Sequence, residues 1–347
     1  MKRQIKLLYS LATTIGTCWC ALVISPDCLP AQKFQQDAWE KLMLDGRAAF
    51  DMRQYAAADR FFSSALFHRD SAGIRDVYLA RVLYELAAVR GLTGRHGDAI
   101  RLLTRAIDLL ETLPEVDSAE LAIASQGLGS AYLGVRAYPK AVQAFSKAID
   151  LRVAKGNAEP ADVLPILIGL SSTYRAQHRN RDAEAALLRA KALFDNPPAS
   201  GQPARAWLLT SLGNFYLSER RFAEAMAPLL QAQSIVEDLV ASAKEAAIPV
   251  ELVRPYISEG LALAFFGQNH YGEAETLFAK ALALGDQGAG MPPAEFARIL
   301  RGYARCLRKL GSRDDAKSLD SRAKAILGAS PGPGDFVIDA SQLIRIK

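Results

Sequence analysis

The chain has 347 residues, of which 50% are hydrophobic and 23% are charged, so it is long enough and apolar enough to bury a core. Its 42 basic and 37 acidic residues leave a formal net charge of +5, which is too small to predict a nucleic-acid partner from bulk charge. With only four cysteines, a dense disulfide framework is excluded.

Residues 1–31 form a segment that differs from the rest of the chain. Lys2, Arg3 and Lys6 give it a positive start, and the apolar stretch Leu7–Ile24 that follows carries no charge. This layout is typical of a secretory signal peptide and predicts export across the inner membrane, to the periplasm or the cell envelope. The threonines within the stretch favour cleavage. An uncleaved anchor stays open because a membrane span needs about 17–25 residues, and membrane contact is expected only in that case.

From about residue 35 onward, alanines recur at steps of 41, 42, 42, 42, 49 and 42 residues. These anchor alanines are Ala58, Ala99, Ala141, Ala183, Ala225, Ala274 and Ala316. A second alanine stands seven residues after each anchor, and in six repeats a bulky apolar residue stands four residues after it. Steps of three, four and seven place side chains on one face of a helix, so the pattern predicts helical hairpins.

Small residues recur twelve positions before each anchor, and they predict close approach of the two helices of a hairpin. They are Gly46, Ala87, Gly129, Ser171, Gly213, Ala262 and Ala304. The 49-residue step adds seven residues around 241–248, which predicts a longer second helix in the fifth repeat. The seventh repeat has Asp320 at the bulky apolar position, as expected of a terminal repeat whose outer face meets water.

The pattern resembles the tetratricopeptide repeat family over residues 35–328. The third repeat carries it best, with GLGSAY at 127–132 and AVQAFSKA at 141–148, and the fifth repeat has SLGNFY at 211–216. The period of 42 is similar to that of kinesin light chain repeats. The resemblance implies an all-α, right-handed superhelical solenoid of about seven antiparallel hairpins, in which the first helix of each hairpin lines a concave groove that binds proteins or peptides.

Catalytic and cofactor motifs are not recognisable in the sequence. The four histidines are scattered over different repeats without a partner at metal-ligand spacing, and there is no phosphate loop or nucleophile elbow. Cys306, the one cysteine beyond the leader, lies in a helical apolar pattern and is predicted to be buried. We therefore expect no enzyme activity, no metal and no cofactor.

The groove positions, read by helical phase, become strongly basic toward the C-terminal end. An apolar and aromatic middle is followed by five basic residues in the last repeat, which steps of three and four place on one stripe. The predicted binding residues are Ile168, Arg175, Trp207, Asn214, Leu217, Tyr256, Phe266, Arg298, Arg301, Arg305, Arg308 and Lys309. Because arginine binds carboxylates well and aromatic residues anchor interfaces, we expect a protein or peptide partner with an acidic segment. Simple solvation of the last hairpin is the alternative for these arginines.

Residues 329–347 form a separate tail. A Pro- and Gly-rich stretch at 330–334 ends the helical pattern, and the β-branched content that follows favours an extended segment. Three functions stay open: an interaction scaffold of the cell envelope, a peptide receptor whose own tail occupies the groove, and a nonenzymatic subunit of an envelope assembly or biosynthetic complex.

Overall fold

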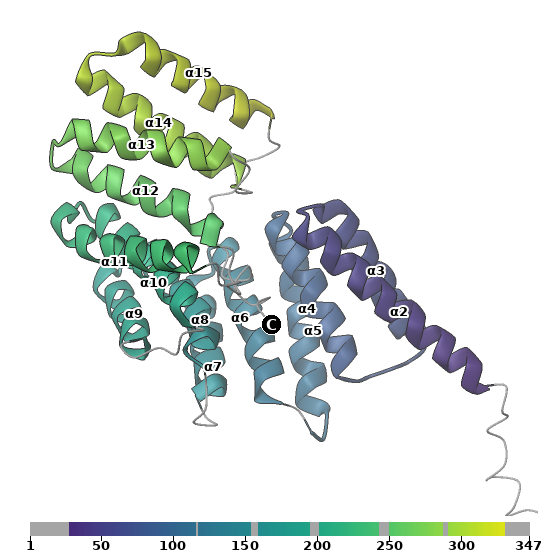
Figure 1. Ribbon diagram of the computed structural model, residues 1–347. Coiled ribbons are helices and arrows are strands. Elements are labelled where there is room, and N and C mark those ends of the chain that lie inside the picture. The colour runs from purple at the N-terminus through teal and green to yellow at the C-terminus, as the bar shows by residue number, and fades with distance from the viewer. Residues whose placement is uncertain are drawn as a thin grey trace, which may run out of the picture.

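The computed structural model describes residues 28–115, 117–153, 159–194, 201–242, 250–286 and 291–329. Within these ranges the chain forms fourteen α-helices and no strand (Figure 1). In chain order they are α2 (Cys28–Asp51), α3 (Tyr55–Ser71), α4 (Val77–Leu92), α5 (His96–Thr112), α6 (Ser118–Gly134), α7 (Tyr138–Val153), α8 (Pro160–Ala176), α9 (Asn180–Leu193), α10 (Gln202–Ser218), α11 (Phe222–Ala241), α12 (Val250–Gly267), α13 (Tyr271–Asp286), α14 (Pro293–Leu310) and α15 (Arg313–Ala329). The predicted leader and tail fall outside the described residues, apart from 28–31 at the start of α2 and residue 329 at the end of α15.

The helices pair into seven antiparallel hairpins, α2 with α3 through α14 with α15, which confirms the predicted repeat number. The turn of each hairpin contains one residue with positive φ, five positions before the anchor alanine. These seven residues are Arg53, Gly94, Arg136, His178, Arg220, Asn269 and Gly311. A residue other than glycine costs free energy in this conformation. The five turns without glycine therefore carry local backbone strain.

Packing within each hairpin follows the predicted register. All seven anchor alanines are at most 1% exposed. Phe145 is fully buried, and it lies against Gly129 of its own hairpin and Gly169 of the next one. A Cβ atom at Gly129 would approach the Phe145 ring to 2.8 Å, and one at Gly169 would approach it to 2.6 Å. The small residues are therefore required so that a bulky residue can fill the space between two adjacent first helices.

The predicted departures from the regular repeat are confirmed. Helix α11 has 20 residues, whereas α9 has 14 and α13 has 16, and the rest of the insertion lies outside the described residues. At the end of the stack, Asp320 forms an ion pair with Arg308 at 2.5 Å, at the position where the other repeats have a bulky apolar residue. Cys306 is fully buried, and its thiol donates a hydrogen bond to the backbone oxygen of Tyr271 at 3.3 Å.

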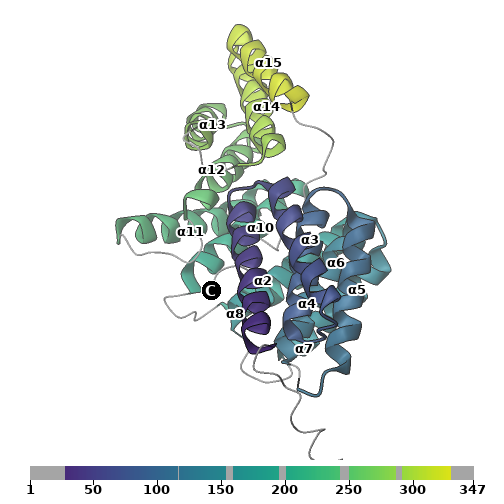
Figure 2. The same ribbon diagram turned by 90° about the vertical axis from the view of Figure 1, so that its right-hand side faces the viewer.

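The hairpins wind into a superhelix, with α2 and α3 at one end and α14 and α15 at the other (Figures 1 and 2). Consecutive first helices, such as α4 and α6 or α10 and α12, pack directly against each other, whereas consecutive second helices make far fewer contacts. The first helices therefore form the inner, concave layer. None of the described helices combines the length and the apolar character that a membrane span requires.

Candidate binding surface

The C-terminal end of the inner layer is dominated by α14. One side of this helix is apolar and buried, with Ala297, Leu300, Ala304 and Leu307. The other side carries five exposed cations, which we call the basic stripe: Arg298, Arg301, Arg305, Arg308 and Lys309. The structure therefore brings together, on one helix, the five basic residues that the sequence placed on one stripe.

Two members of the basic stripe form ion pairs with carboxylates. The Arg298 guanidinium lies 2.9 Å from Glu259 on α12, and Arg308 pairs with Asp320 on α15. The Arg305 guanidinium instead lies 5.0 Å from the centre of the Phe266 ring, within the range of a cation–π contact. An arginine above an aromatic ring keeps its hydrogen-bond donors available to a ligand.

Arg301 and Lys309 make no ion pair and no hydrogen bond with any described residue. Together with Arg305, they leave three positive charges on the stripe that no described carboxylate neutralises. Arg301, Arg305 and Lys309 follow each other at steps of four residues, so their side chains project about 6 Å apart along the helix axis. Such a row can hold more than one carboxylate of a bound segment.

Next to the stripe lies a partly buried cluster of aromatic and acidic residues. The Trp207 and Tyr256 rings meet edge to face with centroids 6.1 Å apart, and the Tyr256 hydroxyl donates to Glu295. Glu259 is only 2% exposed, and this burial raises the pKa of its carboxyl to about 7, although Arg298 acts in the opposite direction. The cluster therefore changes charge near neutral pH at the edge of the basic stripe.

The superhelix brings the first hairpin close to this cluster. Burial and the charge of Glu295 raise the pKa of the Tyr256 hydroxyl, while Arg298 and Arg53 lower it. Arg53 belongs to the turn between α2 and α3, so the first hairpin lies near enough to the sixth for its charge to act on Tyr256.

The structure places the other predicted groove residues unequally. Trp207, Asn214, Leu217, Tyr256 and Phe266 are partly exposed on the first helices α10 and α12, and Arg175 is exposed near the end of α8.

Ile168 corrects the prediction from helical phase. It is 5% exposed and belongs to the main apolar core, because direct packing between neighbouring first helices covers it. We therefore count Ile168 as a core residue and not as a groove residue.

Sequence reasoning did not foresee that Glu259 and Glu295 are buried. Each pairs with a residue 39 positions away, Glu259 with Arg298 and Glu295 with Tyr256. A separation of 39 is one repeat of 42 less one helical turn of about three to four residues. Arg81 and Glu120 in the second and third repeats show the same separation. Polar residues spaced 39 positions apart are therefore the sequence signal that could have identified these pairs.

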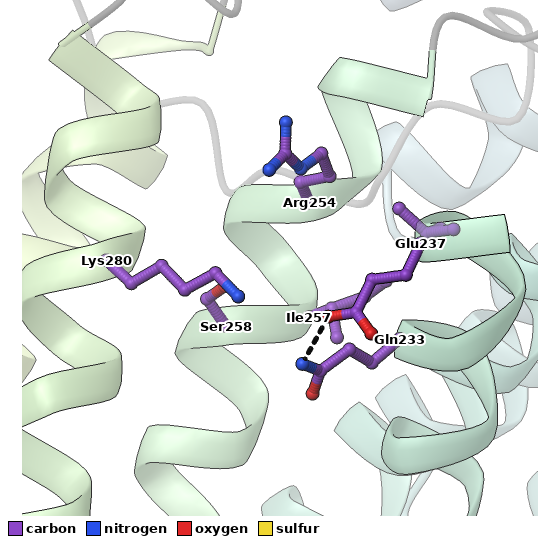
Figure 3. A pocket seen from close by; sticks show the side chains of 7 residues that line it. Gln233, Glu237, Arg254, Ile257, Ser258 and Lys280 are labelled. Atoms are coloured by element: carbon purple, nitrogen blue, oxygen red, sulfur yellow. Dashed lines mark hydrogen bonds between the residues drawn. The ribbon is translucent and has the colours of Figure 1, made fainter. Parts of the chain in front are cut away.

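A small cavity of about 30 Å³ lies between α11, α12 and α13 (Figure 3). Arg254, Ser258 and Lys280 line one side, and on the other side the Gln233 amide donates to Glu237 at 2.7 Å. This volume holds a water molecule or two, but not a peptide side chain. Among the described residues, no group of three or more histidine, cysteine or acidic side chains could hold a metal ion. The exposed inner face, rather than an enclosed pocket, is thus the candidate site.

A family model described as tetratricopeptide repeat matches residues 78–152. Comparison with curated proteins finds no match. Among solved structures, aspartyl phosphate phosphatase F from Bacillus subtilis is similar with a TM-score of 0.64 and 14% identity, over 92% of this chain and 78% of that chain.

Two further solved structures of similar fold are complexes. The Rap conjugation gene regulator of the plasmid pLS20, in complex with the Phr* peptide, has a TM-score of 0.58 at 13% identity and covers 94% of this chain and 80% of its own. A Rap protein complexed with competence and sporulation factor has a TM-score of 0.57 at 13% identity and covers 91% and 79%. At these identities the likeness establishes the fold alone.

Proposed function

We propose that this chain of tetratricopeptide-like hairpins is a nonenzymatic interaction scaffold whose concave face binds a peptide or protein segment with acidic residues. The observation that carries this proposal is the surplus of positive charge on α14. Arg301, Arg305 and Lys309 are exposed, and none of them has a carboxylate partner among the described residues. A charged row of this kind on an inner face gains most from a ligand that supplies the missing carboxylates.

The apolar part of the ligand has a matching surface. Phe266 lies beneath the Arg305 guanidinium, and the Trp207 and Tyr256 rings stand on the two preceding first helices. Aromatic side chains on a preformed surface provide most of the binding free energy in many interfaces. Two neighbours of similar fold are described in complex with a peptide or a factor, which supports a groove ligand of this class.

The proposed location is the periplasm or the cell envelope. It rests on residues 1–31, whose positive start and uncharged apolar stretch are typical of an export signal. A fusion of residues 1–35 to a reporter that is active only after export tests it, and the reporter is expected to be active. A role as a nonenzymatic subunit of an envelope assembly is the second form of the same proposal, in which the bound segment belongs to a stable complex.

The test is crosslinking capture from the native envelope with Arg301→Glu/Arg305→Glu. The matched control is Lys317→Glu/Lys324→Glu, which makes the same charge change on exposed residues of α15. We expect the groove variant to lose at least about tenfold of the captured partner and the control to retain it, because only the first change removes ligand contacts. Equal capture by both variants at low salt would show that the arginines only solvate the last hairpin.

A further inference from the structure

The chain continues for 18 residues beyond Ala329, and this tail carries two carboxylates close to where α15 ends. Resting on the binding role proposed above, we propose that the segment Asp335–Asp339 of the same chain binds the basic stripe of α14 and is displaced by the partner. Arg301, Arg305 and Lys309 would then have an intramolecular ligand in the absence of the external one.

The reach of the tail is sufficient for this contact. Helices α14 and α15 are antiparallel around the turn at Gly311, so Ala329 lies level with the first turn of α14. From there Arg301 is about 10 Å further along the axis and one helix width, about 10 Å, to the side. Six extended residues, from 330 to Asp335, span about 20 Å.

The spacing of charges also agrees between the two segments. Arg301 and Lys309 are eight residues apart on a helix, which is about 12 Å. Asp335 and Asp339 are four residues apart in the tail, which is about 13 Å when the chain is extended. The two carboxylates can therefore meet the two cations that have no described partner.

Val337, midway between the two carboxylates, matches the middle of the basic stripe. In an extended segment alternate side chains point to one side, so Val337 faces the same way as Asp335 and Asp339. It would meet the middle of the stripe, where the Arg305 guanidinium covers the Phe266 ring. An external partner with an apolar side chain between two carboxylates would bind the same cations and the same ring. The tail and the partner would therefore compete for one surface.

The experiment uses a fluorescent peptide with residues 330–343 and a chain that ends at Ala329. This truncation keeps all the described helices. Anisotropy titration is expected to show saturable binding to the truncated chain, and at least fivefold weaker binding to the full-length chain, where the tethered tail competes at a local concentration of about millimolar. An absence of binding at about 1 mM peptide, or equal binding to the two chains, overturns the proposal.

A charge swap identifies the contact. Arg301→Glu/Lys309→Glu in the truncated chain should weaken the peptide at least tenfold, and the peptide with Asp335→Lys/Asp339→Lys should bind this variant better than it binds the unchanged chain. Lys317→Glu/Lys324→Glu should leave the affinity unchanged, and circular dichroism melting checks that each variant is folded. Equal loss with the control variant, or no recovery by the swapped peptide, contradicts a contact with the basic stripe.

The result separates this inference from the proposed function. If envelope capture requires Arg301 and Arg305 while the tail peptide fails to bind, the tail contact is wrong and the scaffold role stands. If the tail peptide binds through the stripe while capture is unaffected by Arg301→Glu/Arg305→Glu, the tail contact stands and the proposed partner site is wrong.

Discussion

The two ends of the inner face use positive charge differently. In the first three hairpins, Arg47 pairs with Glu85, and Arg81 pairs with Glu120, which also accepts a hydrogen bond from Tyr84. Both glutamates are 8% exposed, so the cations hold adjacent repeats together through buried acceptors. On α14, by contrast, five cations meet two carboxylates. The same residue type therefore contributes to stability at one end and remains available to a ligand at the other.

The largest expected effect is a change of the free energy of unfolding with pH. It comes from Glu259, near the C-terminal end of the inner face. The pKa of Glu259 is about 7 in the folded chain and close to 4.5 when unfolded, so the folded state binds the proton more tightly. The resulting stabilisation is complete below about pH 4.5 and is lost as the pH rises to 7. We expect a loss of up to about 3 kcal/mol across this window.

The measurement is urea unfolding at pH 5, 6, 7 and 8 for the unchanged chain and for Glu259→Gln. The amide keeps the shape of the side chain and does not ionise. The variant should gain on the unchanged chain as the pH rises through 7. Parallel pH profiles for the two proteins would mean that Glu259 is ionised throughout and that Arg298 neutralises it fully.

Glu120→Ala should give the next largest effect by breaking the N-terminal network. It removes the acceptor of both Arg81 and Tyr84, and a buried partner is lost at the contact between α4 and α6. Because the Arg81 side chain is 40% exposed and can be solvated, we expect a destabilisation of about 2 kcal/mol, less than for a fully buried pair. Chemical denaturation measures it, and a change below about 0.5 kcal/mol would place this pair with ordinary surface residues.

Substitutions in the hairpin turns should change the free energy of unfolding by about 1 kcal/mol, with opposite signs in the fifth and seventh hairpins. Arg220 has φ of 61°, so Arg220→Gly relieves strain and should stabilise the chain. Gly311 has φ of 92° at the end of α14, so Gly311→Ala should destabilise it. Thermal melting of the two variants should shift in opposite directions, and shifts of the same sign would argue against backbone strain in the turns.

Much of the fold was predictable because small residues recur at fixed positions in each repeat. The anchor alanines and Gly129 report local packing within a hairpin, which depends on helical phase and not on the whole superhelix. The same holds for Cys306, whose burial was visible in its apolar pattern. The basic stripe was predictable for the same reason, since Arg301 and Arg305 lie on one helix.

The remaining features depend on how one repeat is placed on the next. Helical phase alone made Ile168 a groove residue, but direct contact between first helices buries it. The partners of Arg298 and Tyr256 come from neighbouring repeats, 39 residues away. The approach of Arg53 to Tyr256 requires the curvature of nearly the whole stack, which no local pattern specifies.

The surplus positive charge on α14 is the part of the inner face that we propose binds the partner. Arg301→Glu and Arg81→Glu make the same charge change at the two ends of the inner face, and partner capture from native cells is compared for both at matched folded concentration. Arg301→Glu should reduce capture at least about tenfold with its unfolding free energy within about 0.5 kcal/mol of the unchanged chain. Arg81→Glu should lose stability and, where folded, retain capture. Full capture by folded Arg301→Glu would contradict the account.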